Sequence, residues 1–560
     1  MLMNALLLPL TLIATGGGVS TITPSATPTR ATTLEVTSEG AFEHRRYGGT
    51  LVNVTTSEAF TNGGALWTHT DGGAAWIGSA VSIGNIGSQV FTEYDLNNEA
   101  AELFSVYDSD PPTPIWSDGG PLDTEFRMVD SATATDTHVA ISQIVLGGNS
   151  TTRQAVLRKY SSGSGTPDWT YTFTPVINAG SKVGISRDGS TIVAAIMNSN
   201  TTSVEIAVFG PDSGTPTSYT VLPPGSNNSL RGWDLSADGT TLYYSQGTDV
   251  NIYDVAAQAV IFTTNAGASF DSHSISGDGS VFAYGGFGFM RVFTYNGLTY
   301  VNTHTQTLGG SNYCARIDIS DDSSTVAYGW YFYSPGLVVR IEALDLVTGT
   351  VTMSELVTGT GAYQNVVSDI SCSADGSRFA VGLWGDAGNL AAELRLYSNT
   401  QSSPLQTLNL GGSIFDVDLS ADGQRVVGGG KAVHANQFGN GGHVEVLDEG
   451  DEDFIMRGAP RIGTAPDLEI YGPAGQPAIL ISSHLPQDPP IVFPQAGTLY
   501  VKRSQLTFTA IGPVPAGGMK IKSYPIASDN ALVGTNQYLQ VFFLNPRRLT
   551  KDYMKITFLP

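Results

Sequence analysis

The 560-residue chain contains few charged residues, and few of these are basic. Charged side chains make up 14% of the sequence, with 27 Lys and Arg against 50 Asp and Glu, and the formal net charge is −23. Nucleic-acid binding requires clustered Lys and Arg that neutralise phosphates. The composition therefore excludes nucleic acid as a partner, although residues 456–560 alone are basic, with ten Lys and Arg against five Asp and Glu.

Long hydrophobic runs are also scarce. The apolar stretch Ala5–Ala14 is too short to span a bilayer and is typical of the centre of a signal peptide, with a buried first strand as the alternative. A Thr-, Ser- and Pro-rich stretch follows it. We expect a signal peptide at 1–20, a linker and entry strand at 21–60, and a secreted or cell-surface protein with no transmembrane segment after signal removal.

Catalytic motifs are missing as well. The sequence has no G-x-S-x-G, H-E-x-x-H, C-x-x-C or P-loop, and so it lacks the signatures of common hydrolases, zinc enzymes and nucleotide-binding proteins.

The chain does contain a repeated S-x-D-G turn. Six copies place an aspartate at intervals of 40 to 53 residues: Asp188, Asp238, Asp278, Asp322, Asp375 and Asp422. Weaker copies lie near Asn85 and Asp136. A self-similar period of this length is the signature of a β-propeller with one four-stranded blade per repeat. An active site needs one constellation, so a Ser and Asp pair in every repeat is predicted to form a hairpin turn.

The repeats predict an all-β propeller at 61–454, of eight blades if both weak copies are real and seven otherwise. Trp67, Trp116 and Trp169 mark outer strands, and the strand of Trp67 would complete the last blade. Short alternating strands predict a small C-terminal β-sandwich at 455–560.

Apolar residues alternate before each motif serine, which predicts an inner strand with one buried face. The same register places Cys314 and Cys372 on neighbouring strands about five residues apart, or roughly 16 Å. That separation is beyond disulfide reach, so we predict two free, buried thiols.

The S-x-D-G core followed by an alternating V-A strand resembles the WD-like propeller repeats of exported bacterial proteins, including TolB-like and prolyl-oligopeptidase-type propellers. This resemblance implies a fold and export but hardly any function. The stretch "YPIASDNALVGTNQYLQVFFLNP" is similar to a terminal module of secreted bacterial proteins, which implies an accessory role.

Three late repeats have long connections between their second and third strands, at Tyr328–Gly336, Leu383–Ala391 and Gly429–Gly442. Aromatic faces among Asn, Asp and Gly suit sugar rings or a peptide. The candidate ligand-binding residues are Trp330, Tyr331, Tyr333, Trp384, His434 and Phe438. Packing of these rings on blade edges is the alternative.

Aspartates also precede the motif serines, on the predicted inner strands: Asp234, Asp318, Asp369, Asp416 and Asp418. They are weak candidates for a Ca²⁺ site in a central channel, the alternative being hydrogen bonds to strand ends and channel water. Apart from Ca²⁺, no cofactor is expected.

The sequence favours a non-catalytic platform that binds a protein or polysaccharide at the propeller rim. The alternative is a carbohydrate-active enzyme, a lyase or glycosidase, with its site at the central channel. Two or three convergent carboxylate, His, Tyr or Arg side chains at the channel mouth would favour the enzyme.

Overall fold

The computed structural model describes residues 65–558 apart from short internal segments. The predicted signal peptide at 1–20 and the linker and entry strand at 21–60 lie outside the described residues. Within the described ranges, no helix is long and apolar enough to cross a membrane.

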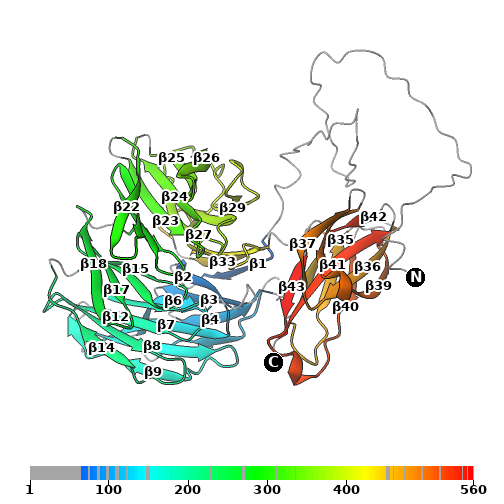
Figure 1. Ribbon diagram of the computed structural model, residues 1–560, viewed down its shortest axis with the longest axis horizontal. Helices are drawn as coiled ribbons and strands as arrows, with labels where there is room; N and C mark the ends of the chain where they lie inside the picture. Colours follow the sequence, from blue (N-terminus) through cyan, green and yellow to red (C-terminus); the bar gives the residue numbers. More distant parts are fainter. Residues whose placement is uncertain are drawn as a thin grey trace, which may run out of the picture. The chain divides into compact units, whose positions relative to one another are not determined.

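Eight antiparallel sheets follow one another between Trp67 and Asp448, seven with four strands and one with five. Their first strands contact one another in chain order, and the first strand of the last sheet, β31, contacts that of the first sheet, β2. The sheets therefore form a closed ring, coloured from blue to yellow in Figure 1. This part of the chain is a β-propeller. Each sheet is one blade, and eight sheets correspond to the larger of the two counts expected from the sequence.

Each blade runs from an inner strand to an outer one. The inner strands are β2 (Trp76–Gly84), β6 (Thr124–Ser131), β11 (Gly180–Ile185), β15 (Leu230–Leu235), β19 (His273–Ile275), β23 (Tyr313–Ile319), β27 (Val367–Cys372) and β31 (Ser413–Leu419). The second strands are β3 (Gln89–Asp95), β7 (Thr137–Val145), β12 (Ile192–Asn198), β16 (Thr241–Gln246), β20 (Val281–Gly286), β24 (Thr325–Phe332), β28 (Arg378–Leu383) and β32 (Arg425–Lys431).

The third strands are β4 (Ala101–Ser105), β8 (Thr152–Ser161), β13 (Ser203–Phe209), β17 (Asp249–Asp254), β21 (Phe289–Tyr295), β25 (Val338–Asp345), β29 (Leu394–Ser398) and β33 (Gly442–Asp448). The outer strands are β5 (Trp116–Asp118), β9 (Trp169–Thr172), β14 (Ser218–Val221), β18 (Ala259–Asn265), β22 (Tyr300–Thr307), β26 (Thr350–Thr358), β30 (Gln406–Leu408) and β1 (Trp67–Asp71). The short β10 (Val176–Ile177) also pairs with β8.

The first described strand closes the ring, as the sequence predicted. β1 pairs antiparallel with β33 and becomes the outer strand of the eighth blade. Trp67 is fully buried in β1, and its indole Nε1 donates to the Val106 carbonyl of the first blade over 3.1 Å. The last blade thus contains both the earliest and the latest strands of the propeller.

Apolar cores lie between the blades. Eight clusters of buried hydrophobic side chains each join two neighbouring sheets, and together they go once around the ring. Ala194 and Ile196 of β12 pack towards the second blade, for example, whereas Val193 and Ala195 pack towards the fourth. Successive residues of a strand point to opposite faces, and both faces of these central strands are covered, so they are apolar along their length.

The repeated motif forms the turn between first and second strands. In all six copies the serine Oγ donates to the aspartate Oδ1 and accepts an N–H five residues later, and the same Oδ1 accepts a second N–H. These contacts satisfy the backbone of a tight hairpin. The Ser and Asp pair is structural, as predicted.

Neighbouring turns are also joined through the backbone. The N–H of Asp238 donates to the Gly277 carbonyl, and the N–H of Gly277 donates to the Asp321 carbonyl. In the later blades the Asp322 N–H donates to the Ala374 carbonyl, and the Ala374 N–H donates to the Ala421 carbonyl. The motif therefore ties one rim of the propeller from blade to blade.

After Asp448 the strands form separate sheets. One contains β34 (Phe454–Arg457), β35 (Asp467–Tyr471) and β40 (Met519–Ser523). The second contains β36 (Pro477–Ser483), β39 (Thr507–Pro513), β41 (Asn536–Leu544), β42 (Arg547–Leu549) and β43 (Met554–Thr557). Both contribute to a single apolar core that includes Leu468, Leu480 and Val541, which is the arrangement of a β-sandwich. A hairpin of β37 (Pro486–Phe493) and β38 (Gly497–Val501) and two 3₁₀ turns, η2 (Arg503–Gln505) and η3 (Asn530–Leu532), complete this part.

Both cysteines are free, as predicted. Cys314 is fully buried between the fifth and sixth blades, and burial raises the pKa of its thiol to about 12. Cys372 differs from the prediction because it keeps part of its surface exposed at the end of β27.

Candidate functional site

The connection expected at Tyr328–Gly336 is shorter than predicted, because β24 continues to Phe332. Trp330 is fully buried, and its Nε1 donates to Glu342 over 3.0 Å. Tyr331 is also buried, and its hydroxyl accepts from Gln364 Nε2 over 2.8 Å. Neither ring presents a face at the rim, so these two residues belong to the packing that was the alternative in the sequence.

Two other candidates lie where the later connections pack together. His434 is buried, with its ring stacked on Tyr363 at 4.7 Å between centroids, and burial lowers the pKa of its imidazole. Trp384 is half-buried, and its backbone N–H donates to the Val366 carbonyl over 3.0 Å. The buried His434 ring thus packs against the inner side of the Tyr363 ring.

The remaining two candidates are exposed. Tyr333 is 47% exposed and Phe438 is completely exposed. Tyr333 stacks on Phe287, with centroids 5.8 Å apart and planes at 26°, and forms a T-shaped pair with Tyr331. Phe287 is 54% exposed and pairs across the blade boundary with Tyr313. The sequence did not single out Phe287 or Tyr313, because Phe287 lies in the short connection between β20 and β21 and Tyr313 is the first residue of β23.

These rings belong to connections at one end of the blades, opposite the S-x-D-G turns. We define the aromatic rim as the segments 333–337, 359–366, 384–391 and 432–439 together with Phe287 and Tyr313, leaving out Pro335, which is not among the described residues. Because strands alternate in direction, connections from second to third strands and from outer to next inner strands lie at this same end. The aromatic rim covers the fifth to eighth blades.

Asp386 fixes one part of the aromatic rim. One carboxylate oxygen accepts from the N–H groups of Leu390 and Ala391, at 2.7 and 2.8 Å. The other accepts from the N–H and hydroxyl of Thr360, at 2.6 and 2.7 Å. These bonds outweigh burial and hold the pKa of Asp386 below its usual range. The connection between β28 and β29 is therefore hydrogen-bonded to the segment that joins β26 to β27.

The last connection is fixed in the same manner. Tyr363, stacked on His434, accepts from Gln437 Nε2 over 2.7 Å. Lys431 donates to the Gln437 carbonyl over 2.6 Å, and His434 Nδ1 accepts from the Asn436 N–H over 3.1 Å. Tyr363 keeps part of its ring exposed, so this contact network holds an aromatic side chain in place at the surface.

The aromatic rim carries almost no charge. Asp386 is the single charged residue in its four segments, and it is buried with both oxygens engaged. Exposed polar groups come from amides, including Gln364, Asn389, Asn436 and Gln437. A chain with a net charge of −23 therefore has a neutral face here.

The candidate metal residues Asp234, Asp318 and Asp418 have a different role. Together with Asp130 they occupy the same register on the inner strands of every second blade, whereas the blades between have Ser82, Gly184, Ser274 and Ser371 at that position. Asp418, for instance, accepts from the Ile83 N–H of the next blade over 2.7 Å.

The other aspartates of this layer also reach forward by one blade. The acceptor and donor pairs are Asp130 with Ile185, Asp234 with Ile275, and Asp318 with Cys372. Burial raises the pKa of Asp130, Asp234 and Asp318 to about 7 and that of Asp418 to about 6, against the opposing effect of these N–H donors. The carboxyls are therefore braces between blades, and no metal-binding cluster of His, Cys, Asp or Glu occurs among the described residues.

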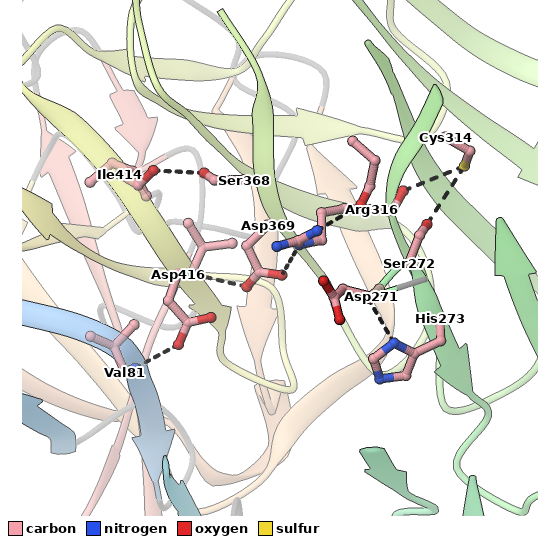
Figure 2. Close-up of polar contacts among 12 residues, drawn as sticks. Val81, Asp271, Ser272, His273, Cys314, Arg316, Ser368, Asp369, Ile414 and Asp416 are labelled. Atoms are coloured by element: carbon pink, nitrogen blue, oxygen red, sulfur yellow. Dashed lines mark hydrogen bonds and ion pairs between the residues drawn. The ribbon is translucent and has the colours of Figure 1, made fainter. Parts of the chain in front are cut away.

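Two further carboxyls, Asp369 and Asp416, lie on β27 and β31, two residues before the position of the alternating aspartates. Figure 2 shows Asp416 beside Asp369, with Arg316 on the far side of Asp369. Asp416 accepts from the Val81 N–H over 2.7 Å, Asp369 accepts from the Val417 N–H over 3.0 Å, and Arg316 Nε lies 4.0 Å from Asp369. Burial and the neighbouring Asp369 raise the pKa of Asp416 well above its usual range.

Two or three convergent carboxylate, His, Tyr or Arg side chains would favour an enzyme, and Asp369, Asp416 and Arg316 reach that number. Each carboxyl nevertheless holds a backbone N–H of the following blade, as the alternating aspartates do. That shared role assigns Asp369 and Asp416 to ring closure, and the enzyme alternative stays a prediction.

No protein-family model matches the chain, and no curated protein matches it at a significant level. Among solved structures, a chain of the mitotic checkpoint complex is similar at 15% identity, with a TM-score of 0.38 over 56% of this chain and 88% of that one. Hydrazine synthase of Kuenenia stuttgartiensis is similar at 15% identity, with a TM-score of 0.34 over 44% and 72%. Neither likeness bears on function, and the fold assignment rests on the sheets themselves.

Proposed function

We propose that the propeller is a non-catalytic binding platform and that it holds a protein or polysaccharide partner on the aromatic rim. The observation that carries this proposal is that four connections of the sixth to eighth blades are joined by hydrogen bonds into one surface. This surface exposes Tyr333, with Phe287 stacked on it, and Phe438. A surface ordered before binding loses little conformational entropy when the partner arrives.

We further propose that the chain works outside the cell or at its surface. The apolar stretch Ala5–Ala14 and the resemblance to exported TolB-like propellers support this location. The basic C-terminal β-sandwich would then be an accessory module, for example one that contacts an anionic surface.

The test compares two pairs of substitutions on opposite rims. The first pair, Tyr333→Ala with Phe438→Ala, removes exposed rings from the aromatic rim. The control pair is Tyr295→Ala with Leu298→Ala, because Tyr295 is 43% and Leu298 is 86% exposed and the Tyr295 N–H bonds to Ser280 in a motif turn.

Retention of each purified chain by intact cells and by extracellular matrix from the producing organism is measured. We expect the first pair to lower retention at least about fivefold, since two exposed aromatic contacts are lost, and the control pair to leave it unchanged. Equal retention of both pairs would contradict the proposal.

A further inference from the structure

The chemistry of the aromatic rim narrows the class of partner. Its exposed polar groups are amides and hydroxyls, its one carboxylate is buried and engaged, and its histidine is buried, which lowers the pKa of the imidazole. Anionic polysaccharides and nucleic acids need cationic side chains, and the four segments contain neither Lys nor Arg. Lys431, which borders the last segment, is buried and donates to the Gln437 carbonyl. The four segments therefore offer no exposed cation to an anionic partner.

The exposed rings are also separated from one another along the rim. Tyr333 is supported by Phe287 and by Tyr331, whereas Tyr363 is supported by His434 on a later connection. Amide groups from Gln364 and Gln437 are bonded to neighbouring tyrosine hydroxyls. Tyr333 and Tyr363 are therefore each held by another ring, and Gln364 and Gln437 are each held by a tyrosine hydroxyl.

The residues of the aromatic rim differ from those typical of protein–protein interfaces. Protein interfaces concentrate binding energy in central apolar pockets rich in Trp, Tyr and Arg. Here the aromatic rim has no Arg, Trp330 is wholly buried, and Trp384 is half-buried. Sugar rings instead offer flat apolar faces bordered by neutral hydroxyls, which match aromatic faces bordered by amides.

We propose that the partner is an uncharged polysaccharide, held by stacking on Tyr333 and Phe438 and by hydrogen bonds from the amides between them. This inference rests on the proposed function and specifies the ligand of the same surface. Tyr333 and Phe438 lie on connections of different blades, so the rim fits an extended chain better than a single monosaccharide.

The test uses affinity electrophoresis of the full chain in gels containing laminarin, mannan, dextran or hydroxyethyl cellulose, with alginate and heparin as anionic comparisons. We expect retardation by at least one neutral polymer, none by the anionic ones, and no change in 0.5 M salt because no charges are screened. Tyr333→Ala and Phe438→Ala should each weaken binding about tenfold, whereas Tyr295→Ala and Leu298→Ala should not.

Failure to bind any of the four neutral polymers would overturn the inference, as would binding that both rims' variants weaken equally or that salt abolishes. If that failure occurs while retention by cells still depends on Tyr333 and Phe438, the partner is a protein and the proposed function stands. If retention also ignores these two residues, both proposals fall.

Discussion

At the residue scale, the motif turn contains one position with a strict conformational demand. Glycine occupies it in five copies, with φ between +64° and +74°, but Ser323 stands there in the sixth blade with φ +61°. The left-handed region costs a residue with a Cβ about 1–2 kcal/mol relative to glycine. Ser323 therefore holds its turn under strain.

Replacing Ser323 by glycine should relieve this strain. We expect Ser323→Gly to raise the free energy of unfolding by about 1 kcal/mol, measured by urea denaturation. The converse change, Gly376→Ser, should destabilise, because φ is +64° there and a Cβ would lie 2.6 Å from Thr325 Oγ1. Equal stability of the two variants would contradict this account.

The sequence predicted these turns because their Ser, Asp and Gly requirements are local. It left the burial of Trp330 open, because Gly329 and the aromatic residues around it resembled an exposed connection. Pairing with β25 keeps Trp330 inside a strand, since the register of β24 continues to Phe332 opposite Val338. Likewise the sequence located Asp418 on an inner strand, but its donor Ile83 lies 335 residues away. Distant partners of this kind leave no local pattern.

At the element scale, β1 determines whether the ring is closed. It is the one propeller strand that joins its blade from the far end of the propeller sequence, and Trp67 packs with residues of both the first and eighth blades. Outer strands elsewhere follow their own blade directly. Three of them, β18, β22 and β26, are long, and each carries a register shift against its neighbour. Such bulges discourage edge-to-edge pairing with another chain.

Loss of the Trp67 side chain should open the ring. We expect Trp67→Ala to lower the free energy of unfolding by about 3–5 kcal/mol and to expose the edge of β33 to proteolysis. Trp169→Ala is the matched control, because Trp169 lies on the outer strand β9 and is only partly buried. Its cost should be less than half as large. Similar costs, measured by chemical denaturation with limited proteolysis, would argue against a special role for β1.

At the scale of the whole molecule, the carboxyls between blades couple stability to pH. A carboxyl whose pKa is raised from near 3.9 to about 7 binds its proton more tightly in the folded chain. Its stabilising contribution is complete below about pH 4 and is lost as the pH rises through 7. The turn aspartates Asp188, Asp278 and Asp375, whose pKa values are lowered by hydrogen bonds against burial, act oppositely at more acidic pH.

The melting temperature should therefore be highest in mildly acidic solution and fall between pH 5 and 8. Asp318→Asn removes one titrating group while keeping an acceptor for the Cys372 N–H, so it should flatten this fall. Asp212→Asn, at an exposed position, should leave the profile unchanged. A melting temperature that rises from pH 5 to 8, measured by differential scanning fluorimetry, would refute the assignment.

The alternation of aspartate with serine or glycine between successive blades has an arithmetical consequence. A two-step pattern closes on itself only when the number of steps is even. A ring of seven would bring two carboxyls, or two small residues, together at the seam. If the propeller grew by duplication, the unit that was copied is a pair of blades, and insertions or losses that survive should come in twos.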